Sequence, residues 1–260
     1  MAPRTTARRS AAGRTAAGRT AAGRTAVRRR TAGAVALGAV AAVALGGCVA
    51  SAGPRETREV EVGDVHAVDL GTGGELTVRR GDRAGLTITA GARTQDRLVV
   101  RERDGVLLLE ADSRPFGGLG DVEYELVLPR VDEVAVSGSG DVELADVTGE
   151  RLRVLVEGSG SVSASGVDAD RVDVTIEGSG GVELSGRAGA ANLSIEGSGD
   201  LDLEDLRLEE ANVSVEGSGD VEVSVRDRLA VSISGSGTVS YTGDPRVEQD
   251  VSGSGSVERG

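Results

Sequence analysis

Carboxylates and hydroxyls recur at fixed positions around a repeated Gly-Ser-Gly tripeptide, and they are the side chains of this sequence whose types and spacing could do chemistry. A glutamate stands two positions before the serine in four successive copies: Glu157, Glu177, Glu196 and Glu216. An aspartate directly follows the tripeptide in three copies: Asp141, Asp200 and Asp220. Carboxylate oxygens are the ligands that hard divalent cations take. The pattern therefore supports two hypotheses, a ladder that binds divalent cations and a solvated acidic face that keeps the protein soluble.

Side chains suited to catalysis are few. His66 is the only histidine, so a Ser/His/Asp arrangement would have to include it, and no nucleophile motif lies near it. Enzymes that cleave polysaccharides need long loops to shape a cleft, whereas copies of 18 to 20 residues leave little room for such loops. The Gly-Ser-Gly copies are not phosphate loops, because no helix follows them to receive an anion at its N-terminus. We therefore expect a protein that is not an enzyme and that has no cofactor.

The Gly-Ser-Gly tripeptide defines an internal repeat. Its copies begin at Gly138, Gly158, Gly178, Gly197, Gly217, Gly235 and Gly253, at steps of 20, 20, 19, 20, 18 and 18 residues. Every second residue from 172 to 184 is apolar or glycine, and a period of two is typical of a β-strand with one buried face. Both glycines fall on the inward side of this frame, which predicts a corner where the strand bends around a narrow core. Coils of this kind bury their apolar rows only by stacking on one another.

The composition favours an all-β fold and excludes one class of partner. The chain has 40 glycines and no tryptophan, so its core must consist mainly of Val, Leu and Ile, which favour strands. Residues 1–47 hold nine arginines and no acidic residue, which leaves 20 basic against 42 acidic residues in the rest of the chain. Such a domain lacks the basic surface that phosphate recognition needs, so we expect no nucleic-acid partner. Residues 59–130 are less regular but strand-like, and we expect one domain over residues 59–260.

The N-terminal segment is typical of an export signal. Residues 1–30 are rich in arginine, and residues 31–47 form an uncharged run dominated by Ala, Val, Leu and Gly. A positive segment, an apolar run and a small-residue cleavage site together form a secretory signal. Residues 45–48 (Leu-Gly-Gly-Cys) resemble the lipobox of bacterial lipoprotein signal peptides, in which the cysteine receives a lipid and the peptide is cut before it.

This resemblance implies a lipoprotein-type signal peptide over residues 1–47, a lipid on Cys48 and a lipid-anchored tether over residues 48–58. The membrane would then be a partner of the protein, with the domain on the extracytoplasmic face of the cell membrane. Cys48 is the only cysteine, so no internal disulfide can form. Sec and twin-arginine export both stay open, because three arginines at residues 28–30 precede the apolar run.

The repeat as a whole resembles a known family, the putative auto-transporter adhesin, head GIN domain family, which is found in bacterial lipoproteins and other exported proteins. The resemblance lies in the copies of the tripeptide from residues 137–141 (Ser-Gly-Ser-Gly-Asp) to residues 252–255, and in Tyr-Thr-Gly-Asp-Pro at residues 241–245. It covers essentially all of residues 59–260. It implies a right-handed parallel β-helix-like solenoid, here with about 18–20 residues per coil, and it brings no catalytic residues.

Three functions are compatible with these features. The first is a non-catalytic, lipid-anchored exported protein that acts in adhesion or in ligand or envelope interaction, with a divalent cation, a glycan or a surface protein as its partner. The second is a structural solenoid that self-assembles through its end coils, similar to the bactofilins. The export signal disfavours it, since bactofilins are cytosolic. The third is a carbohydrate-active enzyme, which the short coils and the scarcity of aromatic residues disfavour. The sequence favours the first.

Overall fold

The computed structural model describes residues 53–112 and 119–260. Within them, 17 strands belong to one sheet, and a four-residue helix, α1 (Ala92–Gln95), lies between two of the strands. The predicted signal peptide and Cys48 lie outside the described residues. The strands before the repeat are β1 (Arg55–Val60), β2 (Ala67–Leu70), β3 (Glu75–Arg80), β4 (Gly85–Gly91), β5 (Leu98–Arg103), β6 (Val106–Ala111) and β7 (Val122–Leu128). The strands of the repeat are β8 (Glu133–Val136), β9 (Asp141–Ala145), β10 (Thr148–Gly158), β11 (Ser161–Gly178), β12 (Gly181–Gly197), β13 (Asp200–Gly217), β14 (Asp220–Gly235), β15 (Thr238–Thr242), β16 (Arg246–Gly253) and β17 (Ser256–Arg259).

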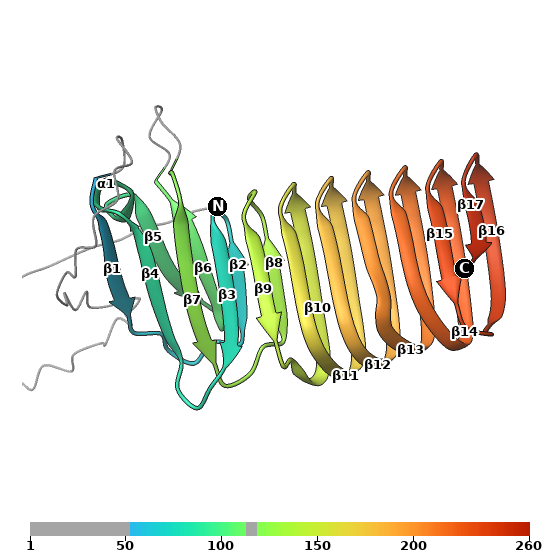
Figure 1. The fold of residues 1–260 in the computed structure, drawn as a ribbon, viewed down its shortest axis with the longest axis horizontal. Coiled ribbons are helices and arrows are strands. Elements are labelled where there is room, and N and C mark those ends of the chain that lie inside the picture. Colours follow the sequence, from blue (N-terminus) through green and yellow to red (C-terminus); the bar gives the residue numbers. More distant parts are fainter. Residues whose placement is uncertain (1–52, 113–118) are drawn as a thin grey trace, which may run out of the picture. The chain divides into compact units, whose positions relative to one another are not determined.

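Successive coils of the repeat pair in parallel and almost entirely in register. β10 pairs with β11, β11 with β12, β12 with β13 and β13 with β14. The ladder continues through the pairs β14–β15, β14–β16 and β15–β17. Figure 1 shows each long strand leaving one tight turn, bending at its far end and returning to the next tight turn. The predicted stack of parallel coils is therefore confirmed for the repeat.

Each coil has two faces, which we name by their direction relative to the Gly-Ser-Gly turn. The exit face consists of the segments that leave a turn: 141–145, 161–165, 181–185, 200–204, 220–224, 238–242 and 256–259. The entry face consists of the segments that run into the next turn: 133–136, 151–157, 171–177, 190–196, 210–216, 228–234 and 246–252. The inward side chains of both faces belong to one hydrophobic cluster. Side chains that point outward on the two faces therefore lie on opposite sides of the coil.

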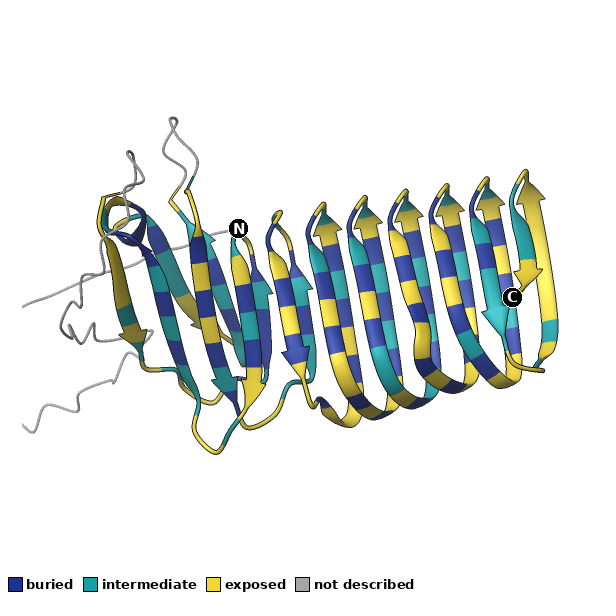
Figure 2. Ribbon diagram, in the orientation of Figure 1, coloured by how far each residue is buried: buried dark blue, intermediate teal, exposed yellow. Residues whose placement is uncertain are grey.

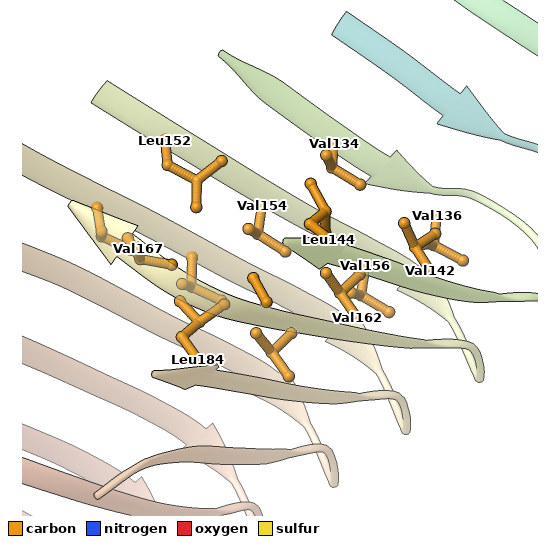
Figure 3. Packing of buried hydrophobic residues seen from close by; sticks show 14 of the residues in the cluster. Val134, Val136, Val142, Leu144, Leu152, Val154, Val156, Val162, Val167 and Leu184 are labelled. Carbon is orange, nitrogen blue, oxygen red and sulfur yellow. The ribbon is translucent and has the colours of Figure 1, made fainter. Parts of the chain in front are cut away.

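The core consists of rows of Val, Leu and Ile that lie next to one another in successive coils. One row of the entry face is at most 1% exposed: Val156, Ile176, Ile195, Val215 and Ile233. One row of the exit face is at most 3% exposed: Val162, Val182, Leu201 and Val221. Figure 2 shows the alternation of buried and exposed positions along each strand, and Figure 3 shows the close packing of valines and leucines between the two faces. Burial of each such side chain contributes about 1.5–3 kcal/mol, so the rows provide most of the stability.

The Gly-Ser-Gly tripeptide forms the tight turn between the two faces, as predicted. The first glycine of six copies has a φ between +119° and +143°, a backbone conformation that residues other than glycine rarely adopt. The second glycine is buried against the preceding coil. A Cβ atom added at Gly180 would lie 2.4 Å from the carbonyl oxygen of Gly160, which no real Cβ tolerates. The tripeptide is therefore required by the backbone path and by the close stacking of successive turns.

The part of the sheet before the repeat mixes parallel and antiparallel pairs. β2 and β3 pair in parallel with β8 and β9, and also with β6 and β7. The pairs β1–β4, β4–β7 and β5–β6 are antiparallel, which the uniform repeat did not predict. β5 and β6 form a hairpin through Asp104 and Gly105, both with positive φ, and such a turn matches the twist of two antiparallel strands.

The first strand changes one predicted boundary. The tether was expected over residues 48–58, but β1 begins at Arg55 and pairs with β4 over its whole length. The hydroxyl of Thr57 lies 3.1 Å from that of Thr89, and the Arg55 guanidinium donates to Glu123 at 2.6 Å. Residues 55–58 therefore belong to the sheet. Because their side chains are polar on both sides of the strand, no apolar alternation marked them as a strand.

A tyrosine with one polar partner lies in the core before the repeat. Tyr124 of β7 is 2% exposed, and its hydroxyl lies 2.9 Å from the hydroxyl of Thr72, which is also buried. Burial raises the pKa of the Tyr124 phenol, and the hydrogen bond to Thr72 and the charge of Arg58 offset this rise only in part. Burial also lowers the pKa of Arg58. The pair satisfies two hydroxyls that would otherwise be buried without a partner.

Candidate functional site

The glutamates predicted as a ladder do form a row. Glu157, Glu177, Glu196 and Glu216 are paired neighbours on the entry face, next to the turn, and all four are exposed. None of them has an ion pair or a hydrogen bond among the described residues. In the part of the chain that the structure describes, no group of three or more acidic, histidine or cysteine side chains has an arrangement that could hold a metal ion. The cation-binding hypothesis therefore stays a prediction from the sequence.

The aspartates lie apart from the glutamates, on the exit face. Asp141 accepts a hydrogen bond from the Ser161 hydroxyl at 2.5 Å. Asp200 accepts one from the backbone N–H of Asp220 at 3.4 Å, and Asp220 accepts one from the N–H of Thr238 at 3.1 Å. Each carboxylate thus bonds to the next coil, a contact that is worth about 0.5–1.5 kcal/mol. The structure separates the seven predicted residues into an exposed row on one face and linking groups on the other.

The serines of the tripeptide also have a structural role. The backbone N–H groups of Ser179, Ser198, Ser218, Ser236 and Ser254 donate to the carbonyl of the first glycine one coil earlier, at 2.8–2.9 Å. Their side chains are exposed at the edge between the two faces. Successive turns are therefore joined by backbone hydrogen bonds.

A groove that the sequence analysis did not predict lies on the entry face. It has a volume of about 660 Å³ and extends over β11, β12, β13, β14 and β16. Its floor includes two outward rows of short side chains, one of hydroxyls and one mainly of acids and amides. The hydroxyl row is Thr175, Ser194, Ser214 and Ser232, and the neighbouring row is Asp173, Asn192, Asn212, Ala230 and Glu248.

The acid and amide row is held in place by hydrogen bonds along the stack. The Asn192 amide donates to Asp173 at 2.7 Å, and the Asn212 amide donates to the Asn192 side-chain oxygen at 3.1 Å. Arg151 forms an ion pair with Asp173 at 3.2 Å, and at the far end Arg228 pairs with Glu248 at 3.1 Å. Such a chain fixes the orientation of each amide.

The hydroxyl row has no such partners. No hydrogen bond involves the hydroxyls of Thr175, Ser194, Ser214 or Ser232 within the described part of the chain, and all four side chains are at least partly exposed. A hydroxyl can donate one hydrogen bond and accept two. The groove therefore presents a row of polar groups at a step of about 4.8 Å, each free to bond to something outside the protein.

The sequence does contain a signal for this groove. A serine or threonine stands four positions before the serine of the turn in four successive copies. Because inward and outward residues alternate along a strand, this position can be assigned to the outward side from the sequence alone. In three of these copies it lies two residues before the glutamate, so it points outward as the glutamate does. A short side chain between longer neighbours is what leaves room for a groove.

Two further hollows have other chemistry. One, of about 560 Å³, lies at the bend of the coils and includes Arg187, Arg207 and Arg226. The Arg187 guanidinium bonds to Asp168 through two nitrogens, which lowers the pKa of that carboxyl, and Arg226 likewise lowers the pKa of Asp227. These ion pairs are solvent-exposed and leave only Arg207 of the three arginines without one among the described residues.

The other hollow contains the single histidine. It has a volume of about 640 Å³, and His66 shares it with Arg130, Asp132, Arg151 and Arg153, among other residues. No serine, threonine or cysteine of the described chain lines it, so the structure assembles no Ser/His/Asp arrangement there. Arg130 pairs with Asp132 at 3.0 Å, and the remaining groups are largely paired in the same way.

The stacked turns and the two-faced coils agree with a family model described as putative auto-transporter adhesin, head GIN domain, which matches residues 64–245. The chain belongs to this family. Membership suggests an extracellular or surface-exposed protein, and the family description names an adhesin and no enzyme. No curated protein matches the chain significantly.

Solved structures share the fold. A putative adhesin from Bacteroides fragilis is similar with a TM-score of 0.74 and 23% identity, over 79% of this chain and 96% of that one. A putative lipid binding protein from Parabacteroides distasonis has a TM-score of 0.67 and 22% identity, with the same coverage. A putative adhesin from Parabacteroides merdae has a TM-score of 0.65 and 20% identity, also over 79% and 96% of the two chains. Among the described residues, no helix is long and apolar enough to span a membrane.

Proposed function

We propose that this chain is an exported, non-catalytic binding protein that is attached to the membrane by a lipid on Cys48 and that uses its solenoid for adhesion or for binding a component of the cell envelope. The family and the names of its structural neighbours support a surface role. Residues 45–48 support the anchor, because they match the lipobox pattern after an apolar run.

The observation that supports binding most directly is the entry-face groove. The part of its floor on β11, β12, β13 and β14 is paired on both edges, and its amide row is fixed by hydrogen bonds, so little order has to be gained there when a ligand binds. Its hydroxyls have no partner in the described protein. The groove also contains no histidine, and two of its three acids, Asp173 and Glu248, are held in ion pairs with arginines. These features support a surface that holds a ligand.

The anchor is tested by Cys48→Ala. The wild-type protein is expected to incorporate a radioactive or clickable fatty acid during growth and to enter the detergent phase on phase separation. The variant is expected to do neither, because two or more acyl chains are needed for stable anchoring. Equal fatty-acid labelling of wild type and variant would contradict the anchor.

The binding surface is tested by filling the groove. Ser194→Tyr and Ser214→Tyr together place two large rings on its floor, and tyrosine is well tolerated in strands. Ser163→Tyr is the matched control, because Ser163 is an exposed outward serine of the exit face. The full-length protein in detergent is mixed with isolated cell-envelope material, and the bound fraction is measured by sedimentation. We expect the double variant to lose most binding and the control to keep it. Equal binding by the double variant would refute the groove as the binding surface.

A further inference from the structure

The walls of the entry-face groove differ in chemistry from its floor. On the turn side lies the glutamate row, of which Glu177, Glu196 and Glu216 flank the hydroxyl row two residues further along each strand. On the bend side lies the row Arg171, Ala190, Glu210, Arg228 and Arg246. Leu155 and Asp250 occupy the positions at the two ends of the hydroxyl row. The floor is therefore flanked on both sides by outward rows of mostly charged side chains.

The charges around the groove do not balance. Asp173 is paired with Arg151 and Glu248 with Arg228. Among the described residues without an ion pair, the groove and its walls hold five carboxylates and two guanidinium groups. The carboxylates are Glu177, Glu196, Glu210, Glu216 and Asp250, and the guanidinium groups are those of Arg171 and Arg246. The field of the groove is therefore negative and complements a ligand with positive charges.

The backbone of the floor limits what kind of chain can bind. The N–H and C=O groups of β12 and β13 are used in pairing with the coils on both sides, so a peptide laid across the strands could not add itself to the sheet. A peptide would also present its polar groups at about 3.3 Å per residue, out of step with hydroxyls about 4.8 Å apart. Sugar rings present hydroxyls on all sides, each a donor and an acceptor, as do the serines and threonine of the floor.

We propose that the entry-face groove binds a linear glycan with free amino groups, whose ring hydroxyls bond to the row from Thr175 to Ser232 and whose ammonium groups lie against Glu177, Glu196 and Glu216. The chain of sugars runs along the stack of coils, across the strands. This inference rests on the proposed binding function and names the class of ligand for the same groove. It also accounts for the acidic row without a metal ion.

The test measures the affinity of the full-length protein in detergent for three oligosaccharides of equal length, by isothermal titration calorimetry. They are a glucosamine oligomer with free amines, its fully N-acetylated form, and an acidic galacturonate oligomer. We expect binding of the glucosamine oligomer, binding of the acetylated form at least tenfold weaker, and no binding of the acidic one. Affinity for the glucosamine oligomer is expected to fall as salt is raised, because the contacts are ionic and exposed.

Two variant sets locate the binding. The triple variant Glu177→Gln, Glu196→Gln and Glu216→Gln should weaken binding by about 3-fold to 160-fold, since the three exposed ion pairs that it removes contribute about 0.2–1 kcal/mol each. The triple variant Glu143→Gln, Glu183→Gln and Glu222→Gln removes the same charge from the exit face and should bind as wild type does. Unchanged far-ultraviolet circular dichroism confirms that both sets are folded.

Each other outcome overturns the inference in a distinct way. Equal affinity for the acetylated oligomer shows that amines are not recognised, and equal losses in the two triple variants show a general charge effect. Tight binding of oligolysine that depends on the same glutamates assigns the groove to basic peptides. If no oligosaccharide binds but the groove-filling tyrosines still abolish envelope binding, the ligand class is wrong and the proposed function stands. If those tyrosines change nothing, the proposed binding surface fails as well.

Discussion

The Gly-Ser-Gly turn leads to a sharp prediction, because its second glycine, Gly180, and the glycine that follows the turn, Gly181, should respond differently to the same substitution. A Cβ added at Gly180 would lie 2.4 Å from the Gly160 carbonyl oxygen and 2.5 Å from a methyl of Val156. A Cβ added at Gly181 would meet nothing closer than 3.9 Å. Neither residue has a positive φ. Gly180→Ala therefore tests the close stacking of turns, and Gly181→Ala is its control one residue away.

The magnitude follows from what must move. To relieve a contact of 2.4 Å, the two turns must separate by close to 1 Å, which weakens the hydrogen bond from Gly181 N–H to the Gly160 carbonyl, now 3.2 Å, and displaces Val156 from its row. Overpacking typically costs about 1–3 kcal/mol and a weakened backbone bond about 1 kcal/mol. We expect Gly180→Ala to lower the free energy of unfolding by about 2–4 kcal/mol. Gly181→Ala should leave it unchanged or raise it by up to about 1 kcal/mol, because alanine reduces the entropy of the unfolded chain.

The assay is thermal unfolding followed by far-ultraviolet circular dichroism, since the chain has no tryptophan for fluorescence. For a domain of this size, 1 kcal/mol corresponds to about 2–4 °C in Tm, so Gly180→Ala should unfold about 4–16 °C below wild type. Gly181→Ala should unfold within about 4 °C of wild type. A Tm for Gly180→Ala that equals that of Gly181→Ala would refute the argument that the second glycine is set by contact with the coil below.

Three further predictions concern other parts of the sheet. The raised pKa of Tyr124 means that the folded state holds this proton more tightly than the unfolded state, so stability is full below pH about 10 and falls as pH rises through the folded pKa. Tyr124→Phe should reduce this alkaline loss of the free energy of unfolding, as measured by urea unfolding at several alkaline pH values. At neutral pH the same variant should cost about 1–3 kcal/mol, because the Thr72 hydroxyl loses its partner. Asp220→Ala removes the acceptor of the Thr238 N–H and should lower the unfolding free energy by about 0.5–1.5 kcal/mol, measured in urea; no change would mean that water replaces the bond. Gln249 occupies an inward position of β16, the last strand of the entry face, but its side chain is exposed. Gln249→Val should therefore extend an apolar surface and increase self-association, measured by sedimentation velocity. An unchanged sedimentation coefficient would show that this strand does not associate.

The repeat could be predicted in detail because its physics is local. The parity of apolar residues between 172 and 184 identifies which side chains are buried, and the step between tripeptides identifies which residues become neighbours in the next coil. The prediction that the second glycine lies on the inward side of the strand is confirmed, as Gly180 is buried. The positive φ of the first glycine was not predicted, since parity describes the side on which a residue lies and not the direction in which its backbone turns.

The part before the repeat was harder to predict, because its pairing depends on partners distant in sequence. β1 pairs with β4, and β2 lies between β6 and β8, so neither neighbour follows from a regular step. The sequence places the three aspartates beyond the turn from the four glutamates, but their bonds to the next coil needed the structure. Glu196 and Asp200 stand on either side of one turn in the sequence, and the paths of the two faces show that their side chains lie on opposite sides of the coil. The groove needed one further comparison, of outward positions between copies.

The residue-by-residue pairing of the coils gives the solenoid a unit of length. Deleting residues 181–199 would join Gly180 directly to Asp200 and keep a complete turn. Thr175 would then face Ser214, and Glu177 would face Glu216, so the groove would be one coil, or about 4.8 Å, shorter with its lateral chemistry unchanged. Duplicating the same residues would lengthen it by the same step. The length of the groove is thus set by the number of coils, in steps of about 4.8 Å, whereas its side-chain chemistry is set by the residues within each coil.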